Sequence, residues 1–317
     1  MQMEYRQLGK SGTRVSVIGL GTNRFGTDAV TQDNVNAIIA AAQERGVNFI
    51  DTANVYQLGK SEERLGIALK GRWDKFVVAT KFVFAMGEGV NDKGASRYHL
   101  QNALDASLRR LQTDHIDLYY VHGWDDTTPI DETLRALDDA VRAGKVRYLG
   151  ASQFAAWQLA YSNLLAELRG WSSFVVSTSH YHMLEREIER EMLPYCRAHR
   201  VGVVPFFPLA GGFLTGKYQR GKPAPAGSRG ESSPYVQKLM TDANFSLLEK
   251  LTAWADAHGR TMSQLAHAWL LAQTPVCSVI SGATSLDQFT ANAQAGDWKL
   301  SDAELKEVNA ILGDEKK

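Results

Sequence analysis

The strongest constraint on the fold is a regular alternation between short apolar segments and segments with helical spacing. Residues 76–82 and 116–122 are largely apolar over the length of a strand, and between them leucine recurs at every third or fourth position from Leu100 to Leu111. Eight such strand and helix pairs follow one another along the chain. Strands this apolar need cover on both faces. The repeat therefore predicts an α/β fold, a closed (β/α)8 TIM barrel.

Segments outside the repeat predict additions to this barrel. Two short strand-like stretches flank the turn-forming tetrad at residues 10–13, which predicts an N-terminal β-hairpin. Residues 244–273 predict extra helices near the C-terminus. The glycine- and proline-rich segment 216–234 is too long for a simple connector, so we expect it to cover a ligand or to be mobile. We expect residues 1–317 to form one domain.

An open, doubly wound sheet is the main alternative fold. Gly19 and Gly21 follow the first barrel strand, as in a dinucleotide-binding turn, but the third glycine of that motif is missing and Gly26 comes too late. The acidic residue expected about 20 residues further on is also missing. Asp51 comes later than that spacing allows, so we favour the barrel.

Composition narrows the class of partner. The 35 basic and 35 acidic residues balance, so no net charge favours nucleic acid or an anionic membrane. Cys196 and Cys277 lie far apart and outside any CxxC motif, which indicates neither a disulfide scaffold nor a zinc cluster. No signal-peptide core is found, and no stretch reaches the roughly 18 apolar residues of a membrane helix. We expect a cytoplasmic protein that acts on small molecules.

Polar residues at the ends of the predicted strands are the candidates for chemistry, because active sites of such barrels lie at the carboxyl ends of the strands. Asp51 ends the second barrel strand and Tyr56 lies five residues on, while Lys81 and His122 end the next two. Each alone could simply brace a loop or pack. Together they suit carbonyl reduction, because an ammonium lowers the pKa of a nearby phenol, a carboxylate holds the ammonium, and an imidazole orients a carbonyl oxygen. A cofactor would supply the hydride.

Two other polar groups receive a plainer interpretation. His180 and His182 could join His122 in the metal site of a barrel hydrolase, but no further ligand stands at a convincing spacing, so we expect no metal. The charged residues between Glu185 and Glu191 are expected to form the solvated face of a helix.

Six separated motifs of this chain resemble the aldo-keto reductase superfamily, in its order and at about its spacing. They are FIDTANVY with SEERLG, ATKF, DLYYVHGWD, LGASQF, PLAGGFLTGKY and VISGATSLDQFTAN. The last two look most like the branch that contains bacterial aldo-keto reductases and potassium-channel β subunits. The resemblance runs nearly end to end. It implies a (β/α)8 barrel that binds NADPH in an extended pose without a Rossmann fold.

The resemblance also implies a role for each matching position. Tyr56 would be the general acid or base, Lys81 and Asp51 would lower its pKa, and His122 would orient the carbonyl. A ring at Phe206 would stack on the nicotinamide, and the backbone of residues 207–212 would hold the pyrophosphate. The expected cofactor contacts are Thr22, Asp51, Ser152, Gln153, Thr178, Phe206, Phe207, Pro208, Leu209, Gly211, Gly212, Lys217, Arg229, Gly282, Thr284, Gln288 and Asn292.

Three positions depart from the family pattern, and three others are expected at the substrate. Gln153 stands where asparagine is usual, Thr178 where glutamine is usual, and Gln288 where an arginine often meets the 2′-phosphate. Lys217 and Arg229 remain to support that phosphate, so NADP(H) is expected and NADH is the less favoured alternative. The residues expected to contact the substrate are Asn23, Phe25 and Trp124.

These observations predict an NADPH-dependent oxidoreductase that interconverts an aldehyde or ketone with its alcohol, with Tyr56 as general acid or base. The alternative is an NADPH-binding sensor or regulatory subunit with little turnover. We expect a small carbonyl or alcohol as the partner, with no nucleic acid and no membrane. Nothing in the sequence sets the oligomeric state.

Overall fold

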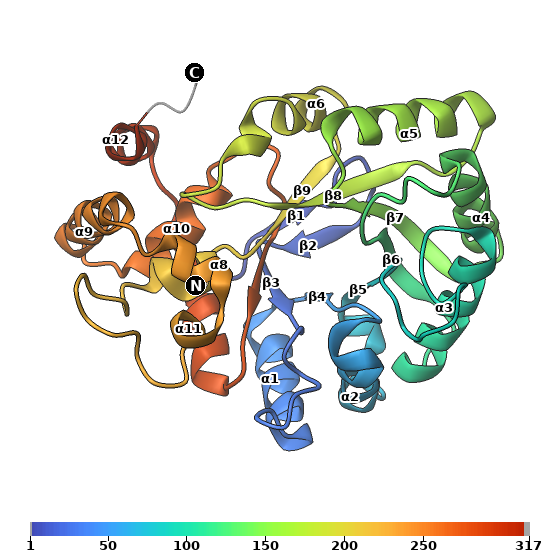
Figure 1. Ribbon diagram of the computed structural model, residues 1–317, viewed down its shortest axis with the longest axis horizontal. Coiled ribbons are helices and arrows are strands. Elements are labelled where there is room, and N and C mark those ends of the chain that lie inside the picture. The colour runs from blue at the N-terminus through green and yellow to red at the C-terminus, as the bar shows by residue number, and fades with distance from the viewer. Residues whose placement is uncertain (1, 314–317) are drawn as a thin grey trace.

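A barrel of eight parallel strands forms the centre of the protein (Figure 1) in a computed structural model that describes residues 2–313. The strands follow the order β10-β3-β4-β5-β6-β7-β8-β9. The barrel closes where Val203 pairs with Val276 and accepts a hydrogen bond from the backbone N–H of Cys277 at 2.9 Å. The predicted (β/α)8 fold is thus confirmed. The strands are β3 (Ile18–Gly21), β4 (Phe49–Asp51), β5 (Val77–Phe82), β6 (Ile116–Val121), β7 (Val146–Ser152), β8 (Phe174–His180), β9 (Gly202–Phe206) and β10 (Val279–Gly282).

Helices between successive strands surround the barrel (Figure 1). Their ends follow local chemistry: the Thr31 side chain accepts from the backbone of Asn34 to begin α1, and Gly46 ends that helix in a left-handed conformation. Their apolar stripes, such as Val35 and Ile38 of α1, pack against the outside of the strands. These helices are α1 (Gln32–Arg45), α2 (Lys60–Leu69), α3 (Arg97–Leu111), α4 (Ile130–Arg142), α5 (Ala156–Arg169), α6 (Met192–Ala198), α10 (Met262–Leu271) and α11 (Leu286–Ala295).

The predicted N-terminal hairpin is confirmed as β1 (Tyr5–Gln7) paired with β2 (Arg14–Ser16). Leu8 and Val15 of this hairpin are fully buried and pack among side chains inside the barrel. Gly9 has a φ of 57°, and a Cβ there would lie 1.9 Å from the carbonyl oxygen of Val175. The hairpin turn therefore fits tightly against the start of β8 and seals the amino end of the barrel.

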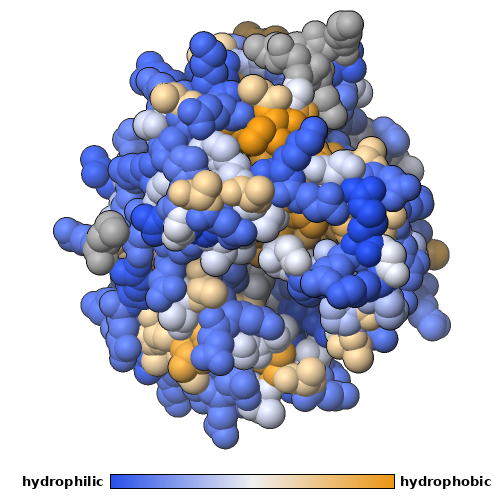
Figure 2. Space-filling model, turned by 90° about the vertical axis from the view of Figure 1, so that its left-hand side faces the viewer, coloured by the Kyte–Doolittle hydropathy of each residue, from blue (hydrophilic) through white to orange (hydrophobic). Residues whose placement is uncertain are grey.

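The extra C-terminal helices are α9 (Asp242–Ala257) and α12 (Asp302–Leu312). They are tied to each other and to the barrel by indole hydrogen bonds, from Trp254 to Glu307 at 2.9 Å and from Trp269 to Asn309 at 2.8 Å. Figure 2, which faces this side of the molecule, shows a mainly hydrophilic surface with small, separated apolar areas. Among the described residues, no helix has the length and apolar character needed to cross a bilayer.

The long segment after β9 folds back on itself. It leaves the 3-10 segment η4 (Ala210–Thr215), forms the short helix α7 (Arg229–Ser232) and returns in α8 (Pro234–Leu239). The missing side chain of Gly211 makes room for this return, because a Cβ there would lie 2.6 Å from Cγ2 of Val236. The segment is thus an ordered cover over η4.

The helix predicted between Glu185 and Glu191 does not form, although Glu187, Arg190 and Glu191 are exposed to solvent as expected. Only the short turn η3 (Glu187–Glu189) forms there, and α6 begins at Met192. Arg186 donates two hydrogen bonds of 2.9 Å to Glu189 and lies over the ring of Trp269. The pair is drawn inward because the hydroxyl of Tyr181 also donates to Glu189, at 2.8 Å.

Candidate active site

Four of the predicted residues meet at the carboxyl ends of three neighbouring strands. Asp51 ends β4, Lys81 lies near the end of β5, and His122 directly follows β6. Tyr56 begins the 3-10 turn η1 (Tyr56–Gly59) that follows β4. Because the strands are parallel and adjacent, their ends deliver these side chains to one place. We call Asp51, Tyr56, Lys81 and His122 the tetrad.

The ammonium of Lys81 is the centre of the tetrad. It is paired with the Asp51 carboxylate, and it donates to the carbonyl oxygen of Thr52 at 2.7 Å and to the hydroxyl of Tyr56 at 3.3 Å. The side chains of Lys81 and Asp51 are only 3% and 5% exposed. A charge this buried persists only when it is paired and hydrogen-bonded, so all three donors of the ammonium are used to hold it in one position.

Charge and burial oppose each other at Lys81 and Tyr56. Burial lowers the pKa of Lys81, but Asp51 and Tyr56 raise it by more, so the ammonium stays charged. Burial also raises the pKa of Tyr56; Lys81 acts in the lowering direction and Asp51 in the raising one, and the net change is upward. Lys81 thus acts on the pKa of Tyr56 in the expected lowering direction, whereas Asp51 acts in the opposite direction and burial outweighs Lys81. The phenol keeps its proton at neutral pH.

His122 is a neutral imidazole beside the phenol. Burial, and then the charge of Lys81, lower the pKa of His122 to about 2. Its ring meets that of Tyr56 edge-on at 6.0 Å and packs against Phe84 at 4.6 Å. Its Nδ1 atom is buried and has no hydrogen-bond partner among the described residues. A neutral ring can either donate to or accept from a substrate oxygen.

The turn that carries Tyr56 has an unusual backbone. Gln57 and Leu58 follow it with φ values of 52° and 51°, a left-handed conformation that side-chain-bearing residues rarely adopt. The side chain of Leu58 is exposed, so apolar burial does not stabilise this turn. Strain of this kind concentrates at functional sites. No sequence signal announced it, because neither residue is the glycine or asparagine typical of that conformation.

Aromatic side chains form one side of the rim near the tetrad. Trp124 meets Phe154 edge-on at 5.2 Å and Trp157 at 5.7 Å, and its indole N–H donates to Asp126 at 2.7 Å. Trp157, in the first turn of α5, is 61% exposed and is not among the residues predicted to contact the substrate. Phe84, in the segment after β5, packs against the ring of His122. An aromatic wall is therefore present beside His122.

The other two expected substrate residues behave differently. Phe25 is fully buried in the core between the barrel and its helices, so its prediction as a substrate contact is wrong. An apolar residue after a strand can turn either way, and this one turns inward. Asn23 is partly exposed, and its side-chain oxygen lies near Gly282 on the neighbouring strand.

Two of the three positions that depart from the family pattern lie near the ends of β7 and β8. Gln153 has a φ of 57° and donates from its side chain to the carbonyl oxygen of His122 at 3.2 Å. Thr178 is buried and donates to the carbonyl oxygen of Val204 at 2.8 Å. Its hydroxyl proton is thus already used within the barrel wall. The neighbouring Ser152 is also buried.

Thr22 has a structural task as well. Its side chain is fully buried and donates to the backbone carbonyl of Asp51 at 3.0 Å. The hydroxyl of Ser61 in turn bonds Thr22 and Thr52. These bonds fix the strand end that carries the Asp51 carboxylate.

Aromatic rings also mark the end of β9. The ring of Phe206 stacks on His180 at 5.2 Å, with an angle of 8° between the planes. Phe207 is 37% exposed, and the guanidinium of Arg229 lies 5.5 Å from its ring centre. The segment after β9 thus presents flat apolar surface next to a cation.

The backbone after Phe207 forms a tight left-handed turn. Positive φ values occur at Phe207 (57°), Ala210 (50°), Gly211 (67°) and Gly212 (102°), with Pro208 and Leu209 between them. The ammonium of Lys217 lies 3.1 Å from where a Cβ of Gly212 would stand. Among the described residues, no carboxylate forms an ion pair with Lys217 or Arg229. Irregular backbone with unpaired cations is typical of a phosphate site.

Four of the expected cofactor contacts, Gly282, Thr284, Gln288 and Asn292, gather from the end of β10 into α11. Gln288 accepts from the backbone and the hydroxyl of Thr284, both at 2.9 Å. Asn292 donates to the carbonyl oxygen of Gly282 at 3.1 Å. The structure therefore brings these residues together as one surface, already ordered by their own hydrogen bonds.

His180 and His182 take part in another arrangement. Both imidazoles contact the hydroxyl of Tyr235 on α8, at 3.0 and 2.6 Å. Among the described residues, no group of three or more histidine, cysteine or acidic side chains could hold a metal ion.

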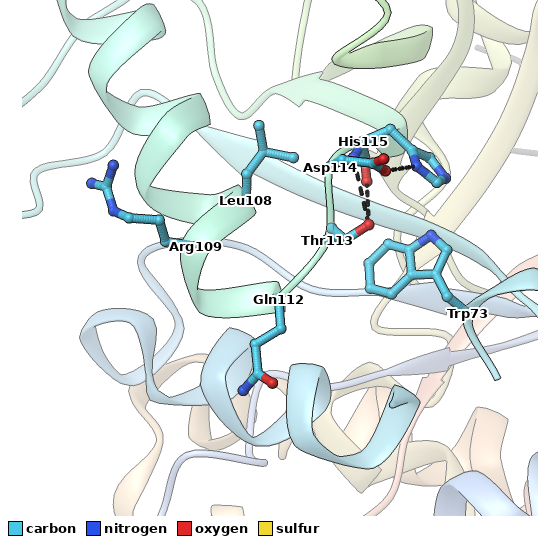
Figure 3. Close-up of a pocket in the computed structure, with 7 residues that line it drawn as sticks. All are labelled: Trp73, Leu108, Arg109, Gln112, Thr113, Asp114 and His115. Atoms are coloured by element: carbon cyan, nitrogen blue, oxygen red, sulfur yellow. Dashed lines mark hydrogen bonds and ion pairs between the residues drawn. The ribbon is translucent and has the colours of Figure 1, made fainter. Parts of the chain in front are cut away.

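The depression shown in Figure 3 lies elsewhere on the molecule. It encloses about 670 Å³ and is lined by Trp73, Leu108, Arg109, Gln112, Thr113, Asp114 and His115. Trp73 precedes β5, and His115 directly precedes β6. The depression is therefore at the amino end of the barrel, away from the tetrad, where side chains of such barrels serve stability.

The fold and the rim together define a TIM barrel that holds a buried carboxylate and ammonium beside a phenol and an imidazole at its mouth. The model of the Aldo/keto reductase family matches residues 17–312, and the chain belongs to that family.

Relatives of known name bear this out. Uncharacterized oxidoreductase YrpG of Bacillus subtilis is 36% identical, over 98% of this chain and 96% of its own. A probable voltage-gated potassium channel subunit beta of Arabidopsis thaliana is 36% identical, over 93% and 92%. L-glyceraldehyde 3-phosphate reductase of Escherichia coli is 32% identical, over 99% and 93%. The resemblance to the bacterial and channel-subunit branch is thus confirmed.

Proposed function

We propose that this protein is an NADPH-dependent oxidoreductase that interconverts an aldehyde or ketone with its alcohol, using Tyr56 as the general acid or base. The observation that carries the proposal is the position of the Lys81 ammonium. It touches the hydroxyl of Tyr56 while it is held by the Asp51 carboxylate, and a neutral His122 lies against the same phenol. A proton donor and an oxygen-binding group therefore share one site.

The residues of this chain manage the proton of the reaction. Tyr56 donates its O–H to the carbonyl oxygen, and the nearby ammonium stabilises the phenolate that remains. His122 holds the same oxygen by a hydrogen bond from its neutral ring. In the oxidative direction Tyr56 takes the alcohol proton as a base. A bound nicotinamide cofactor supplies the hydride or accepts it.

The segment after β9 fits such a cofactor. Phe206 offers a ring face, the left-handed turn of residues 207–212 offers backbone N–H groups, and Lys217 lies beside Gly212. Arg229 and Lys217 supply positive charge without a carboxylate partner in the described part of the chain, which favours a phosphate-rich ligand. This charge supports NADPH over NADH, although Gln288 offers an amide where an arginine would add a third cation.

The test is turnover by the purified protein with NADPH or NADH and a panel of aromatic and aliphatic aldehydes and ketones. Wild-type protein should consume NADPH, with a lower KM than for NADH. Tyr56→Phe should lower kcat by about 10² to 10⁴, the usual contribution of a general acid or base. Tyr195→Phe, which removes a hydroxyl far from the tetrad on α6, is the control. No NADPH consumption by wild type, or an unchanged rate in Tyr56→Phe, would contradict the proposal.

A second candidate function is an NADPH-binding regulatory subunit with little turnover. It is favoured by the similarity to the potassium channel subunit beta, which matches the similarity to the bacterial oxidoreductase. The complete tetrad favours the enzyme instead. Tight NADPH binding with negligible steady-state turnover across the carbonyl panel would favour the subunit.

A further inference from the structure

We propose that Tyr235 is a positioning residue for the cofactor, fastened by His180 and His182 so that α8 and the segment before it stay closed over the end of β9. We call Tyr235 with these two histidines the Tyr235 latch. The inference rests on the proposed function, because it assigns the latch to the same nicotinamide nucleotide site. No residue of the latch belongs to the tetrad.

The hydrogen bonds of the latch have one consistent direction. The backbone N–H of Leu184 donates to Nδ1 of His182 at 3.1 Å, so the proton of this neutral imidazole is on Nε2. That Nε2–H donates to the hydroxyl oxygen of Tyr235 at 2.6 Å. The hydroxyl proton is then free to bond Nε2 of His180, 3.0 Å away. The Tyr235 hydroxyl thus accepts from His182 and donates to His180, in a chain of hydrogen bonds that begins at the backbone N–H of Leu184.

The latch is held without charge. Burial lowers the pKa of His180, and burial together with His180 lowers the pKa of His182 to about 3. Burial, with a further contribution from Glu185, raises the pKa of Tyr235. All three groups are therefore neutral near pH 7, and each proton in the chain has a defined acceptor. A phenylalanine at position 235 would leave the buried Nε2–H of His182 without its partner.

The latch connects two regions that are distant in the sequence. His180 ends β8 and His182 follows it, whereas Tyr235 lies in the first turn of α8. The ring of Tyr235 stacks on Phe207 at 5.9 Å with 19° between the planes, and its neighbour Val236 fills the space left by Gly211. The return of the long segment onto η4 is therefore fastened to the barrel at this residue.

The same contacts reach the surface assigned to the cofactor. His180, which accepts from Tyr235, stacks on Phe206, and Phe207 contacts both the ring of Tyr235 and the guanidinium of Arg229. If Tyr235 is released, the support behind both rings and the segment that bears Arg229 are released with it. We therefore expect the latch to act on the retention of the nucleotide rather than on proton transfer at Tyr56.

The test compares Tyr235→Phe with wild type by NADPH binding and by steady-state kinetics. This change keeps the ring on Phe207 and removes only the hydroxyl. The Kd and KM for NADPH should rise by roughly 3- to 10-fold, the effect of losing one or two neutral hydrogen bonds, while kcat stays within about twofold. Tyr195→Phe is the matched control, since it removes a hydroxyl bonded to Asn163 on another side of the barrel, and it should leave the Kd unchanged.

A second variant tests whether the histidine acts through the same bond. His180→Phe keeps a ring against Phe206 and loses the acceptor for Tyr235. If both residues act through one hydrogen bond, the double variant should raise the Kd no more than the more affected single variant. Additive effects of the two changes, or an unchanged Kd in a folded Tyr235→Phe protein, would overturn the proposal.

Proteolysis without cofactor gives an independent measurement. Trypsin can cut after Arg220 in the segment covering η4, but not after Lys222, which precedes Pro223. Cleavage after Arg220 should be several-fold faster in Tyr235→Phe than in wild type or Tyr195→Phe, because it requires local opening. Equal cleavage rates would overturn the latch, whether or not the wild-type protein binds nucleotide. A wild-type protein that binds no nucleotide would refute the proposed function, independently of the cleavage rates. Faster cleavage with an unchanged Kd would overturn its role at the cofactor.

Discussion

The tetrad and the Tyr235 latch share the rim of one barrel, yet different forces hold them. Lys81 and Asp51 form a buried ion pair between neighbouring strands, and the ammonium has no donor left over. The latch joins a strand to a loop helix through neutral hydrogen bonds and stacked rings.

This difference separates a part that must stay fixed from a part that can open. A buried charge that loses its partner costs several kcal/mol, so the tetrad has one arrangement. A neutral hydrogen bond contributes about 1 kcal/mol net, so the latch can be broken and remade within the folded protein. The chemistry is thereby kept rigid, while the cover over the proposed nucleotide site can let a ligand in and out.

The largest effect should come from breaking the ion pair of the tetrad. Lys81→Met leaves the Asp51 carboxylate buried alone, so we expect a loss of about 3–5 kcal/mol in the free energy of unfolding and a fall in kcat of about 10² to 10⁴. Urea unfolding and steady-state turnover measure the two effects. The double variant Lys81→Met with Asp51→Asn should recover much of the stability and none of the activity. Recovery of activity would show that the ammonium is only structural.

The Lys81→Met variant should also show a stronger pH dependence of stability than the wild type. Burial already raises the pKa of Asp51, and the opposing effect of Lys81 is lost in this variant. The folded state then binds the proton more tightly than the unfolded state. The contribution of protonated Asp51 to stability is therefore fully present below the ordinary aspartate pKa of about 3.9, and it is lost as the pH rises through the higher folded-state pKa. Stability independent of pH would contradict this account.

A smaller effect is expected where α8 presses on η4. Gly211→Ala places a methyl group 2.6 Å from Val236 in a left-handed backbone, so we expect a loss of about 1–3 kcal/mol in stability and weaker NADPH binding. Gly144→Ala is the matched control, because Gly144 also has a positive φ, of 75°, but nothing lies within 4 Å of its Cβ position. Thermal unfolding and NADPH titration compare them. Equal losses would show that packing of α8 contributes nothing.

The smallest effect is expected at a phenol beside the tetrad. The ring of Tyr120 lies 5.7 Å from the Lys81 ammonium, but its buried hydroxyl has no hydrogen-bond partner among the described residues. Tyr120→Phe removes a polar group that costs energy to bury, so stability should stay the same or rise by about 1 kcal/mol. Activity should remain within about twofold. A tenfold loss of kcat would place Tyr120 within the proton-handling group.

The features predicted best from the sequence are those that the barrel strands position. Lys81 and His122 end apolar runs in adjacent strands, and parallel strands must bring their ends together, so the location of the tetrad followed from pattern alone. The raised pKa of Tyr56 did not follow, because the depth of burial depends on the whole rim. Phe25 failed for a related reason, since a loop residue can point toward either side.

Features made by loops and tertiary contacts could not be predicted. The Tyr235 latch depends on where a long segment returns, which no local pattern specifies. Arg186 and Glu189 have the spacing of a solvated helix face, but the contacts with Tyr181 and Trp269 draw them inward. Local sequence spacing therefore predicts which charged residues pair, but the exposure of each pair to solvent depends on the assembled fold.

The hairpin seal has a consequence for biosynthesis. Leu8 and Gly9 leave the ribosome well before Val175 and the strands around it. The hairpin therefore cannot dock in its final position until β8 and β9 have been synthesised, and until then Leu8 and Val15 are not fully buried. During that interval the nascent chain exposes apolar surface that later strands of the barrel must cover, and chaperones can bind such surface.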